Sequence, residues 1–500
     1  MAHASGTAAD GFIAADFTHV ASGVHYRVTK DNGQVWLLYE REGAPPDPEL
    51  KGRQELRYFI GSGKRGRTFL FEQQGYWFEA PINWYSKKQI WDMAPNFQSA
   101  REMPLTLPVD PGCLHCHASD VAHSSPQVRN LYAGAPFGQG GITCEACHGD
   151  SRPHVASSGK VPLLKIDSLE PVRRDSICLN CHLEGREVVI RDRKRAEDFV
   201  PGDNLFDIAT YFVYRSENGA GGRATSQWEA LSHSECKKKS CDRLTCTTCH
   251  DPHDSPTDQT KVAFYRQRCL GCHNEPGFAQ KHHLENPDCS SCHMARPPTN
   301  DIAHEQVTDH WIRKHVTNRR EPATTGGELE AINGTVADDR DLGLAYAQLA
   351  AGGDEDAGKR ALALLERAEH NGGEARGDHE LHADLGFLEQ MNGQGPAASE
   401  EYQMALDADP FDSLAAGDLA LLDARKHRYG EAVQLWKRVF EDDPAQLGAG
   451  LNLAIVECGL GEKTDAEATL GRILEFAPDD EEAKDLLIGV QSGARKCDSH

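Results

Sequence analysis

The feature that most constrains this chain is a five-residue motif, Cys-x-x-Cys-His, which occurs six times between Cys113 and His293. Fourteen of the sixteen cysteines lie in this stretch, and most of the histidines lie there too. A segment that collects both residue types is a metal or haem region. The same segment has too few aliphatic residues for a conventional core, so bound groups must supply much of the apolar bulk of its fold.

The spacing within each motif has a chemical reason. Two thiols three residues apart can bond the two vinyl groups of one porphyrin, and the histidine that follows can ligate its iron. The paired cysteines are Cys113 and Cys116, Cys144 and Cys147, Cys178 and Cys181, Cys246 and Cys249, Cys269 and Cys272, and Cys289 and Cys292. The histidines that follow them are His117, His148, His182, His250, His273 and His293. The motifs therefore predict six covalently attached haem c groups.

Zinc is the main rival to haem. A zinc ribbon uses Cys-x-x-Cys pairs that lie fifteen to twenty residues apart, and the sixteen residues between Cys272 and Cys289 would permit it. A ribbon does not require a histidine after its second cysteine, however, and all six pairs have one. The repeated histidine favours haem.

The sixth ligand of each iron decides what a haem can do. An iron with two protein ligands only passes electrons, whereas an iron with an open face can bind a substrate. Ten further histidines in the segment could close the irons: His115, His123, His154, His233, His253, His282, His283, His304, His310 and His315. His154 and His253 follow their own motifs too closely to fold back onto those irons, so each is expected to ligate a neighbouring haem. Two methionines, Met103 and Met294, are weaker candidates.

Residues 1–110 are predicted to be rich in β-structure. His25 to Tyr39 alternates in polarity around Asn32-Gly33, a pair typical of tight hairpin turns. The segments 55–60 and 67–71 flank a second, glycine-rich turn. The nearby aromatic residues are expected to cover the sheet or a haem edge; they are Tyr76, Trp77, Trp84, Tyr85 and Trp91.

Residues 337–490 have a different periodicity. Pro410, Pro444 and Pro478 are 34 residues apart, and several alanine, leucine and aromatic positions keep the same step. This period predicts tetratricopeptide repeats, which are stacked pairs of helices. We assign three copies, 378–412, 413–446 and 447–480, with a degenerate copy at 341–377. The concave surface of such an array usually binds a protein, although a purely structural cap for the haem segment is the alternative.

The chain therefore divides into a β-rich region at 1–110, a hexahaem segment with little regular structure at 111–320, and an all-α repeat solenoid at 337–490. The charge follows this division. Residues 321–500 contain 38 acidic and 15 basic side chains, whereas residues 1–320 are nearly neutral. An acidic surface disfavours nucleic acid and suits a basic protein partner, and a solvated helical surface kept soluble by its charge is the alternative.

The sequence shows no pattern typical of a transmembrane helix or of a signal peptide. No stretch approaches the roughly 18 apolar residues of a transmembrane helix, and the first twenty residues lack the pattern of a signal peptide. Because haem attachment to such motifs takes place outside the cytoplasm, we expect an extracytoplasmic protein. The sequence is then a mature form, or Met1 is an internal start.

Four cysteines lie outside the motifs. Cys236 and Cys241 could form a small disulfide or remain free thiols near a haem. Cys458 is expected to be a small buried apolar residue in a repeat helix, and Cys497 to lie in a frayed tail.

Several segments resemble the bacterial multihaem cytochromes of the doubled Cys-x-x-Cys-His class, which are often fused to tetratricopeptide repeats. The resemblance is carried by Gly141-Ile-Thr-Cys-Glu-Ala-Cys-His-Gly, Thr245-Cys-Thr-Thr-Cys-His-Asp-Pro-His and Cys289-Ser-Ser-Cys-His-Met-Ala-Arg-Pro. It implies an extracytoplasmic electron carrier related to the tetrahaem cytochromes of nitrogen metabolism. The positions that match distal ligands in that class are His154, His253, His304 and His310. Relatives often carry a further motif before the sheet region, and this sequence begins without one.

Two functions remain in competition at this stage. The favoured hypothesis is electron transfer through six haems, with the repeats docking a redox partner. The alternative is an oxidoreductase that acts on a small nitrogen or sulfur compound at one five-coordinate haem. A third idea, a repeat-based assembly protein with structural haems, is disfavoured because six redox-active groups would then have no use.

Overall fold

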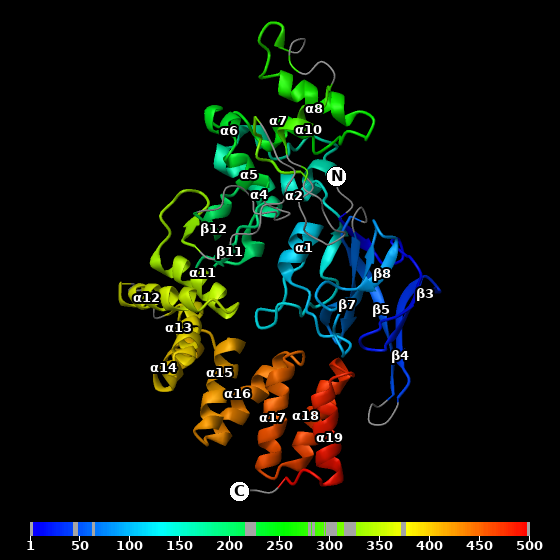
Figure 1. The fold of residues 1–500 in the computed structure, drawn as a ribbon, viewed down its shortest axis with the longest axis vertical. Coiled ribbons are helices and arrows are strands. Elements are labelled where there is room, and N and C mark those ends of the chain that lie inside the picture. The colour runs from blue at the N-terminus through cyan, green and yellow to red at the C-terminus, as the bar shows by residue number, and fades with distance from the viewer. Residues whose placement is uncertain are drawn as a thin grey trace. The chain divides into compact units, whose positions relative to one another are not determined.

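The computed structural model describes residues 4–43, 49–62, 66–215, 227–278, 282, 286–294, 296, 308–314, 327–371 and 377–497. The chain divides into two compact units. The first unit contains residues 141–337, and the second unit contains residues 4–140 together with 338–500. Figure 1 labels the elements of both units.

The N-terminal sheet is an antiparallel meander. Its strands are β2 (Ala15–Thr18), β3 (His25–Asp31), β4 (Gln34–Arg41), β5 (Leu50–Ile60), β6 (Gly66–Gln73), β7 (Tyr76–Tyr85) and β8 (Ile90–Met93), and β1 (Ser5–Thr7) pairs with β5. The predicted hairpin is confirmed: Asp31 pairs with Gln34 across a two-residue turn. Asn32 and Gly33 both adopt positive φ, as that turn requires.

One face of the sheet forms a core rich in aromatic and aliphatic residues, among them Tyr26, Leu37, Phe69, Phe71 and Phe78. The predicted aromatic residues do cover the sheet. The rings of Trp84 and Trp91 meet edge to face. Trp77 is buried in a second apolar cluster, against which Cys113 of the first motif packs.

The repeats form a succession of paired helices, as Figure 1 shows. The helices are α11 (Asp339–Ala351), α12 (Glu355–Asn371), α13 (His379–Met391), α14 (Gly395–Ala408), α15 (Ser413–Arg425), α16 (Tyr429–Asp442), α17 (Leu447–Gly459), α18 (Lys463–Phe476) and α19 (Glu481–Ser492). The degenerate first copy also forms a helix pair, α11 and α12. The periodic positions Tyr402, Trp436 and Leu470 are at most 2 % exposed, so the 34-residue period reports the interior of the array.

The sheet and the last repeat pack together within the second unit. The Phe476 ring is 1 % exposed and meets Tyr76 and Phe78 edge to face. Beside it, the guanidinium of Arg41 donates two hydrogen bonds to the carboxylate of Asp479, whose side chain is fully buried. The sequence predicted the sheet and the repeats separately and gave no sign of this contact.

The first motif also belongs to this unit. It lies on α1 (Pro111–His117), which is followed by the small β-ribbon of β9 (Ala118–Val121) and β10 (Phe137–Gly140). Asp110 caps the helix by accepting a hydrogen bond from Gly112 N. The other five motifs lie in the first unit.

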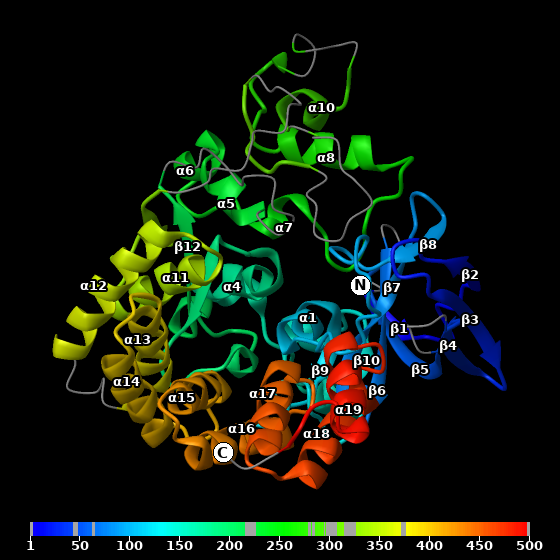
Figure 2. The same ribbon diagram turned by 60° about the horizontal axis from the view of Figure 1, so that its bottom comes forward.

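The first unit consists of short elements joined by irregular segments. Figure 2 shows its short helices. The helices are α2 (Glu145–His148), α3 (Arg152–Ala156), α4 (Pro171–His182), α5 (Gln227–Ser232), α6 (Glu235–Lys239), α7 (Cys246–Cys249), α8 (Lys261–Leu270) and α10 (Cys289–His293). A three-stranded sheet joins β11 (Glu187–Ile190), β12 (Ala209–Tyr214) and β13 (Leu329–Ala331). Among the described residues of the whole chain, no helix combines the length and apolarity needed to cross a bilayer.

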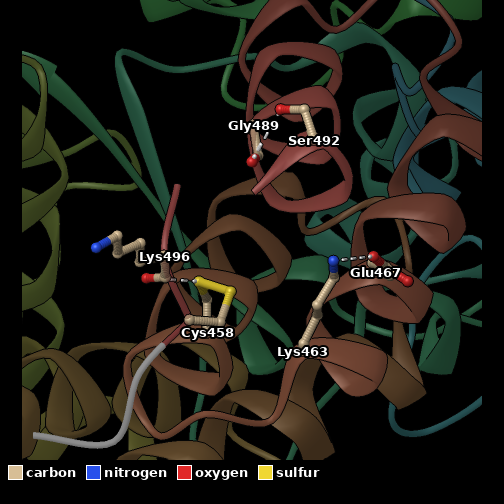
Figure 3. Close-up of a disulfide and its surroundings, with 7 residues drawn as sticks. Cys458, Lys463, Glu467, Gly489, Ser492 and Lys496 are labelled. Atoms are coloured by element: carbon tan, nitrogen blue, oxygen red, sulfur yellow. Dashed lines mark hydrogen bonds and ion pairs between the residues drawn. A yellow bond between two sulfur atoms is a disulfide. The ribbon is translucent and has the colours of Figure 1, made fainter. Parts of the chain in front are cut away.

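The expectation for the two C-terminal cysteines was wrong in part. Cys458 is buried, as predicted, but it forms a disulfide with Cys497, a residue expected to lie in a frayed tail. Figure 3 shows this bond, with the carbonyl of Lys496 beside the Cys458 sulfur. A separation of 39 residues gave no local signal for the pairing. The disulfide ties the C-terminal segment to α17.

Candidate functional site

Each Cys-x-x-Cys-His motif lies on a helical turn, which is a short helix in most motifs and the C-terminal end of a longer helix in the third (α4) and the fifth (α8). The turn is closed by the backbone: His148 N donates to Cys144 O at 2.8 Å, and His250 N donates to Cys246 O at 2.9 Å. His273 N makes the same bond to Cys269 O at 3.0 Å. Because residues i and i+3 lie on one face of a helix, the turn presents the two thiols of a motif to the same side. This is the arrangement that attachment to one porphyrin edge requires.

Three of the motif histidines are oriented by hydrogen bonds between Nδ1 and a backbone carbonyl. His148 Nδ1 lies 2.9 Å from Leu164 O, and His293 Nδ1 lies 2.8 Å from Arg313 O. His117 Nδ1 lies 3.3 Å from Ala4 O. A carbonyl oxygen can only accept, so Nδ1 must carry the proton in each case. Nε2 is then the nitrogen whose lone pair can bind a metal.

Three of the motif histidines lie close to a second imidazole. The ring centres of His148 and His253 are 6.2 Å apart, with 13° between the ring planes. His250 and His310 are 6.1 Å apart, and His293 and His282 are 5.9 Å apart. Because a metal–imidazole bond is about 2 Å long and the ring centre lies about 1 Å beyond the nitrogen, two imidazoles on opposite sides of one iron have centres about 6 Å apart.

This spacing is also within the range of ordinary aromatic pairs. What favours metal ligation is the combination of spacing with orientation, because Nδ1 of both His148 and His293 is already engaged by a carbonyl. The residues present therefore fit a haem iron held between two histidines.

The backbone around His310 is held in place by the side chain of Ser234. Its carbonyl accepts from Ser234 Oγ, and the same hydroxyl accepts from Ile312 N at 2.8 Å. Burial lowers the pKa of His310 to about 4, a bond to the Thr308 carbonyl opposes the shift, and the charges of His250 and His182 add to it. The neutral imidazole that results is the form that ligates metals.

The thiols of successive motifs in the first unit are neighbours. The pKa of the Cys178 thiol is raised, first by a hydrogen bond with Cys246 and then by burial and by the charges of Cys246 and Cys147. Burial raises the pKa of Cys269 to about 12, with contributions from Cys289 and Cys249.

These interactions connect the motifs into a series. The second motif neighbours the third, the third neighbours the fourth, the fourth neighbours the fifth, and the fifth neighbours the sixth. Groups attached at these positions would lie close to one another, which suits electron transfer from haem to haem.

The first motif has a more apolar setting. Cys113 packs at the edge of a cluster that contains Trp77, Leu114 and Phe137. Burial raises the pKa of its thiol to about 12, and the charges of Glu79 and Asp110 add to the effect.

The remaining predicted ligands lie in varied positions. His154 lies on α3 with Nδ1 2.6 Å from Val161 O, an orientation like that of the motif histidines. His182 is hydrogen-bonded to Gln227 and its pKa is lowered, chiefly by burial. The His273 ring lies 5.5 Å from Phe278. His304 is outside the described residues, as are His283 and His315.

One histidine was not singled out from the sequence. His282 was one of ten candidates and lies beside His283 in a Lys-His-His run, so nothing local distinguished it. The structure brings it to His293. The sequence allows either a disulfide or two free thiols at Cys236 and Cys241, and the structure has them as free cysteines.

Comparison with protein families gives three matches along the chain. Residues 82–149 match the family described as cytochrome c554 and c-prime. Residues 233–278 match the doubled CXXCH motif, and residues 424–487 match the tetratricopeptide repeat.

Among curated proteins, the chain is similar to the multiheme cytochrome MtrA of Shewanella baltica, with 23 % identity over 214 residues. The match covers 39 % of this chain and 56 % of that protein, so the chain spans little more than half the length of this relative.

Solved structures similar to part of this chain include MamA and a tetratricopeptide repeat protein. MamA AMB-1 is 20 % identical over 31 % of this chain and 80 % of its own, with a TM-score of 0.28. A tetratricopeptide repeat protein from Parabacteroides merdae is 16 % identical over 31 % of this chain and 61 % of its own, also with a TM-score of 0.28. The assignment of the repeats rests on the family match and on the helix pairs themselves.

Proposed function

This chain is a multihaem c-type cytochrome that carries tetratricopeptide repeats, and we propose that it transfers electrons through six covalently attached haems. The twelve motif cysteines would form the thioether bonds, and the six motif histidines would be the proximal ligands. Haem c supplies an iron that alternates between two oxidation states. The protein supplies attachment, axial ligands and the spacing between neighbouring groups.

The observation that carries this proposal is the set of three imidazole pairs. They support His253 as the sixth ligand for the haem of the second motif, His310 for the fourth and His282 for the sixth. An iron closed by two histidines has no position for a substrate. His154 and His304 stay proposed as ligands for other haems.

The repeats are proposed to dock the redox partner. Most of the net negative charge of the chain lies in residues 321–500, which suits a partner with a basic surface. An extracytoplasmic location is part of the same proposal, because covalent haem attachment and the disulfide between Cys458 and Cys497 both suit an oxidising compartment.

One observation favours the second candidate, an oxidoreductase with an open haem. At the fifth motif, the aromatic ring of Phe278 lies beside His273 at a ring-plane angle of 22°. An apolar side chain near an iron could shelter a site for a small ligand. If catalysis occurs in this protein, we expect it at the fifth motif.

The deciding experiment is a count of haems together with their spin states. Mass spectrometry and the pyridine haemochrome assay give the number of haems per chain, and electron paramagnetic resonance gives the spin states of the oxidised protein. The expected result is six low-spin haems that do not bind carbon monoxide or nitrite. One high-spin haem that binds these ligands would contradict a role in electron transfer alone and would favour the oxidoreductase.

A further inference from the structure

The repeat region contains a second cluster of metal-binding side chains, distinct from the haem motifs in both residues and chemistry. Glu369 near the end of α12, His382 on α13 and Glu401 on α14 converge between the first two helix pairs. One ligand atom from each residue lies within 4.8 Å of the other two. These three helices follow one another in Figure 1, where α12 and α13 are yellow and α14 is darker yellow.

The imidazole forms the buried base of this cluster. The His382 side chain is 1 % exposed, and its Nδ1 lies 2.8 Å from Glu401 Oε2. The Glu401 side chain is 16 % exposed, and Glu369 is half-buried. An ion can therefore reach the carboxylates from solvent while the histidine stays enclosed by helices.

The charges around the cluster are mostly negative. Burial raises the pKa of Glu369 first, and the carboxylate of Glu401 raises it further; the imidazoles of His382 and His370 oppose the shift, and Glu366 adds to it. The pKa of Glu389 is raised as well, by burial and then by Glu366 and Glu401. Several carboxylates are thus held together in spite of their repulsion, and a divalent cation would relieve it.

The simplest rival is an ion pair between a protonated His382 and Glu401, with Glu369 as a bystander. That pair accounts for two of the three residues. It does not account for the approach of Glu369 from another helix. A metal would use all three donors.

We propose that Glu369, His382 and Glu401 bind one divalent transition-metal ion, with zinc as the reference ion. One imidazole nitrogen and two carboxylate oxygens form a donor set that suits zinc and similar borderline ions, with water completing the coordination. Because zinc bonds to nitrogen and oxygen are about 2 Å long, donors on one ion lie at most about 4 Å apart, and the cluster needs only a small contraction. The ion cross-links α12 to α13 and α14, and so fixes the junction between two repeats.

The test uses the full-length, haem-loaded protein after dialysis against a chelator. Isothermal titration with zinc chloride is compared between the wild type, the double variant Glu369→Gln/Glu401→Gln and the control Glu400→Gln. Glu400 is exposed and adjacent to Glu401, so it controls for the loss of one neighbouring charge. The wild type and the control are expected to bind one more zinc per chain than the double variant.

The glutamine substitutions keep the side-chain shape, and unchanged far-ultraviolet circular dichroism and haem absorbance establish that the variants are folded. Free thiols elsewhere in the chain bind zinc equally in all three proteins and cancel in the difference. Equal stoichiometry in the three proteins would overturn the proposal and leave the ion pair. As an independent measurement, anomalous diffraction at the zinc edge is expected to show a peak among the three side chains and none in the double variant.

Discussion

At the scale of single residues, the placement of histidines is what links one haem motif to another. His253 follows the fourth motif by three residues, yet its ring centre lies 6.2 Å from that of His148 in the second motif. The ring centre of His310 lies 6.1 Å from that of His250 in the fourth motif. A histidine so close to its own motif cannot turn back onto that iron, so it is available to a neighbour. Each such ligand would join two motifs.

Replacement of His253 by alanine tests this arrangement. If His253 is a sixth ligand, its loss converts one low-spin haem to a high-spin haem and leaves the number of attached haems unchanged, because the cysteines and His148 are retained. Electron paramagnetic resonance and carbon monoxide binding measure the change. The control is His427→Asn on a turn of the repeats, where positive φ suits asparagine. Identical spectra of the two variants would remove His253 from the ligand set.

Glu457 is a buried acid in a repeat helix, and it makes stability depend on pH. It is 5 % exposed and accepts a hydrogen bond from Thr469 at 2.9 Å. Burial raises its pKa from 4.5 to about 7, against the effect of that hydrogen bond. Its contribution to folding is therefore complete at low pH and is lost as the pH rises through the interval between these two values.

The variant Glu457→Gln is expected to unfold at a higher temperature than the wild type at pH 8, and at nearly the same temperature at pH 4.5. The amide keeps the hydrogen bond and carries no charge to bury. Thermal melts followed by circular dichroism at both pH values measure the difference. Glu441→Gln, at an exposed position on α16, serves as the control. An equal gain at both pH values would contradict the assignment to charge burial.

At the scale of elements, the disulfide between Cys458 and Cys497 closes a loop that contains α18 and α19. A cross-link of this length stabilises a fold by about 2–4 kcal/mol, because it restricts the unfolded chain. We expect Cys497→Ser to lower the free energy of unfolding of the repeats by that amount, as measured by denaturant titration. A reductant should lower the stability of the wild type and leave the variant unchanged. If the reductant affects both equally, the disulfide does not carry the effect.

Elements that depend on local chemistry could be predicted from the sequence. The turn at Asn32-Gly33 specified its hairpin and the register of both strands. The 34-residue spacing of prolines specified the repeats, because each period buries an equivalent large side chain such as Tyr402 or Trp436. The six motifs could be located for the same reason.

Features that depend on distant contacts could not be predicted. Phe476 is an ordinary residue of the last repeat helix, and only the folded chain brings it to the sheet. Cys458 and Cys497 had no signal that marked them as partners. His282 and His283 are equivalent in sequence, and only the backbone of the segment decides that His282 meets His293.

At the scale of the whole molecule, residues from both ends of the chain stabilise one unit. The carboxylate of Asp479 accepts hydrogen bonds from Arg41, from Lys484 Nζ and from the backbone N of Met103. The Arg41 side chain is only 15 % exposed. Removal of the carboxylate would leave a largely buried guanidinium without its partner, which costs about 3–5 kcal/mol in comparable cases.

Asp479→Ala is therefore expected to lower the unfolding free energy of the sheet as well as that of the repeats. Trp436 lies in the repeats, so fluorescence is measured in a Trp436→Phe background, where it reports chiefly on the tryptophans of β4, β7 and β8. Circular dichroism at 222 nm reports on the helices, and both transitions should shift together. The control is Lys463→Ala, which removes an exposed ion pair with Glu467 and should cost less than about 1 kcal/mol. A shift of the helical transition alone would mean that the two parts unfold independently.

The uneven charge of the chain is expected to affect the rate at which the protein associates with a partner. Residues 321–500 contain 23 more acidic than basic side chains, whereas the rest of the chain is almost balanced. If the repeats dock a basic redox protein, the encounter rate falls as salt screens the attraction. Stopped-flow measurement of electron transfer from a basic single-haem cytochrome should show a second-order rate constant that drops about tenfold between about 20 mM and about 500 mM salt.

A variant that neutralises part of the repeat surface tests whether the repeats cause this salt dependence. Glu431, Glu441 and Glu482 are exposed on α16 and α19, and the triple change to glutamine should weaken the salt dependence and slow the reaction at low salt. An anionic small-molecule reductant provides the opposite case, since its rate should rise with salt. If the triple variant keeps the full salt dependence, the partner approaches the haem segment directly, and the acidic repeats have another role.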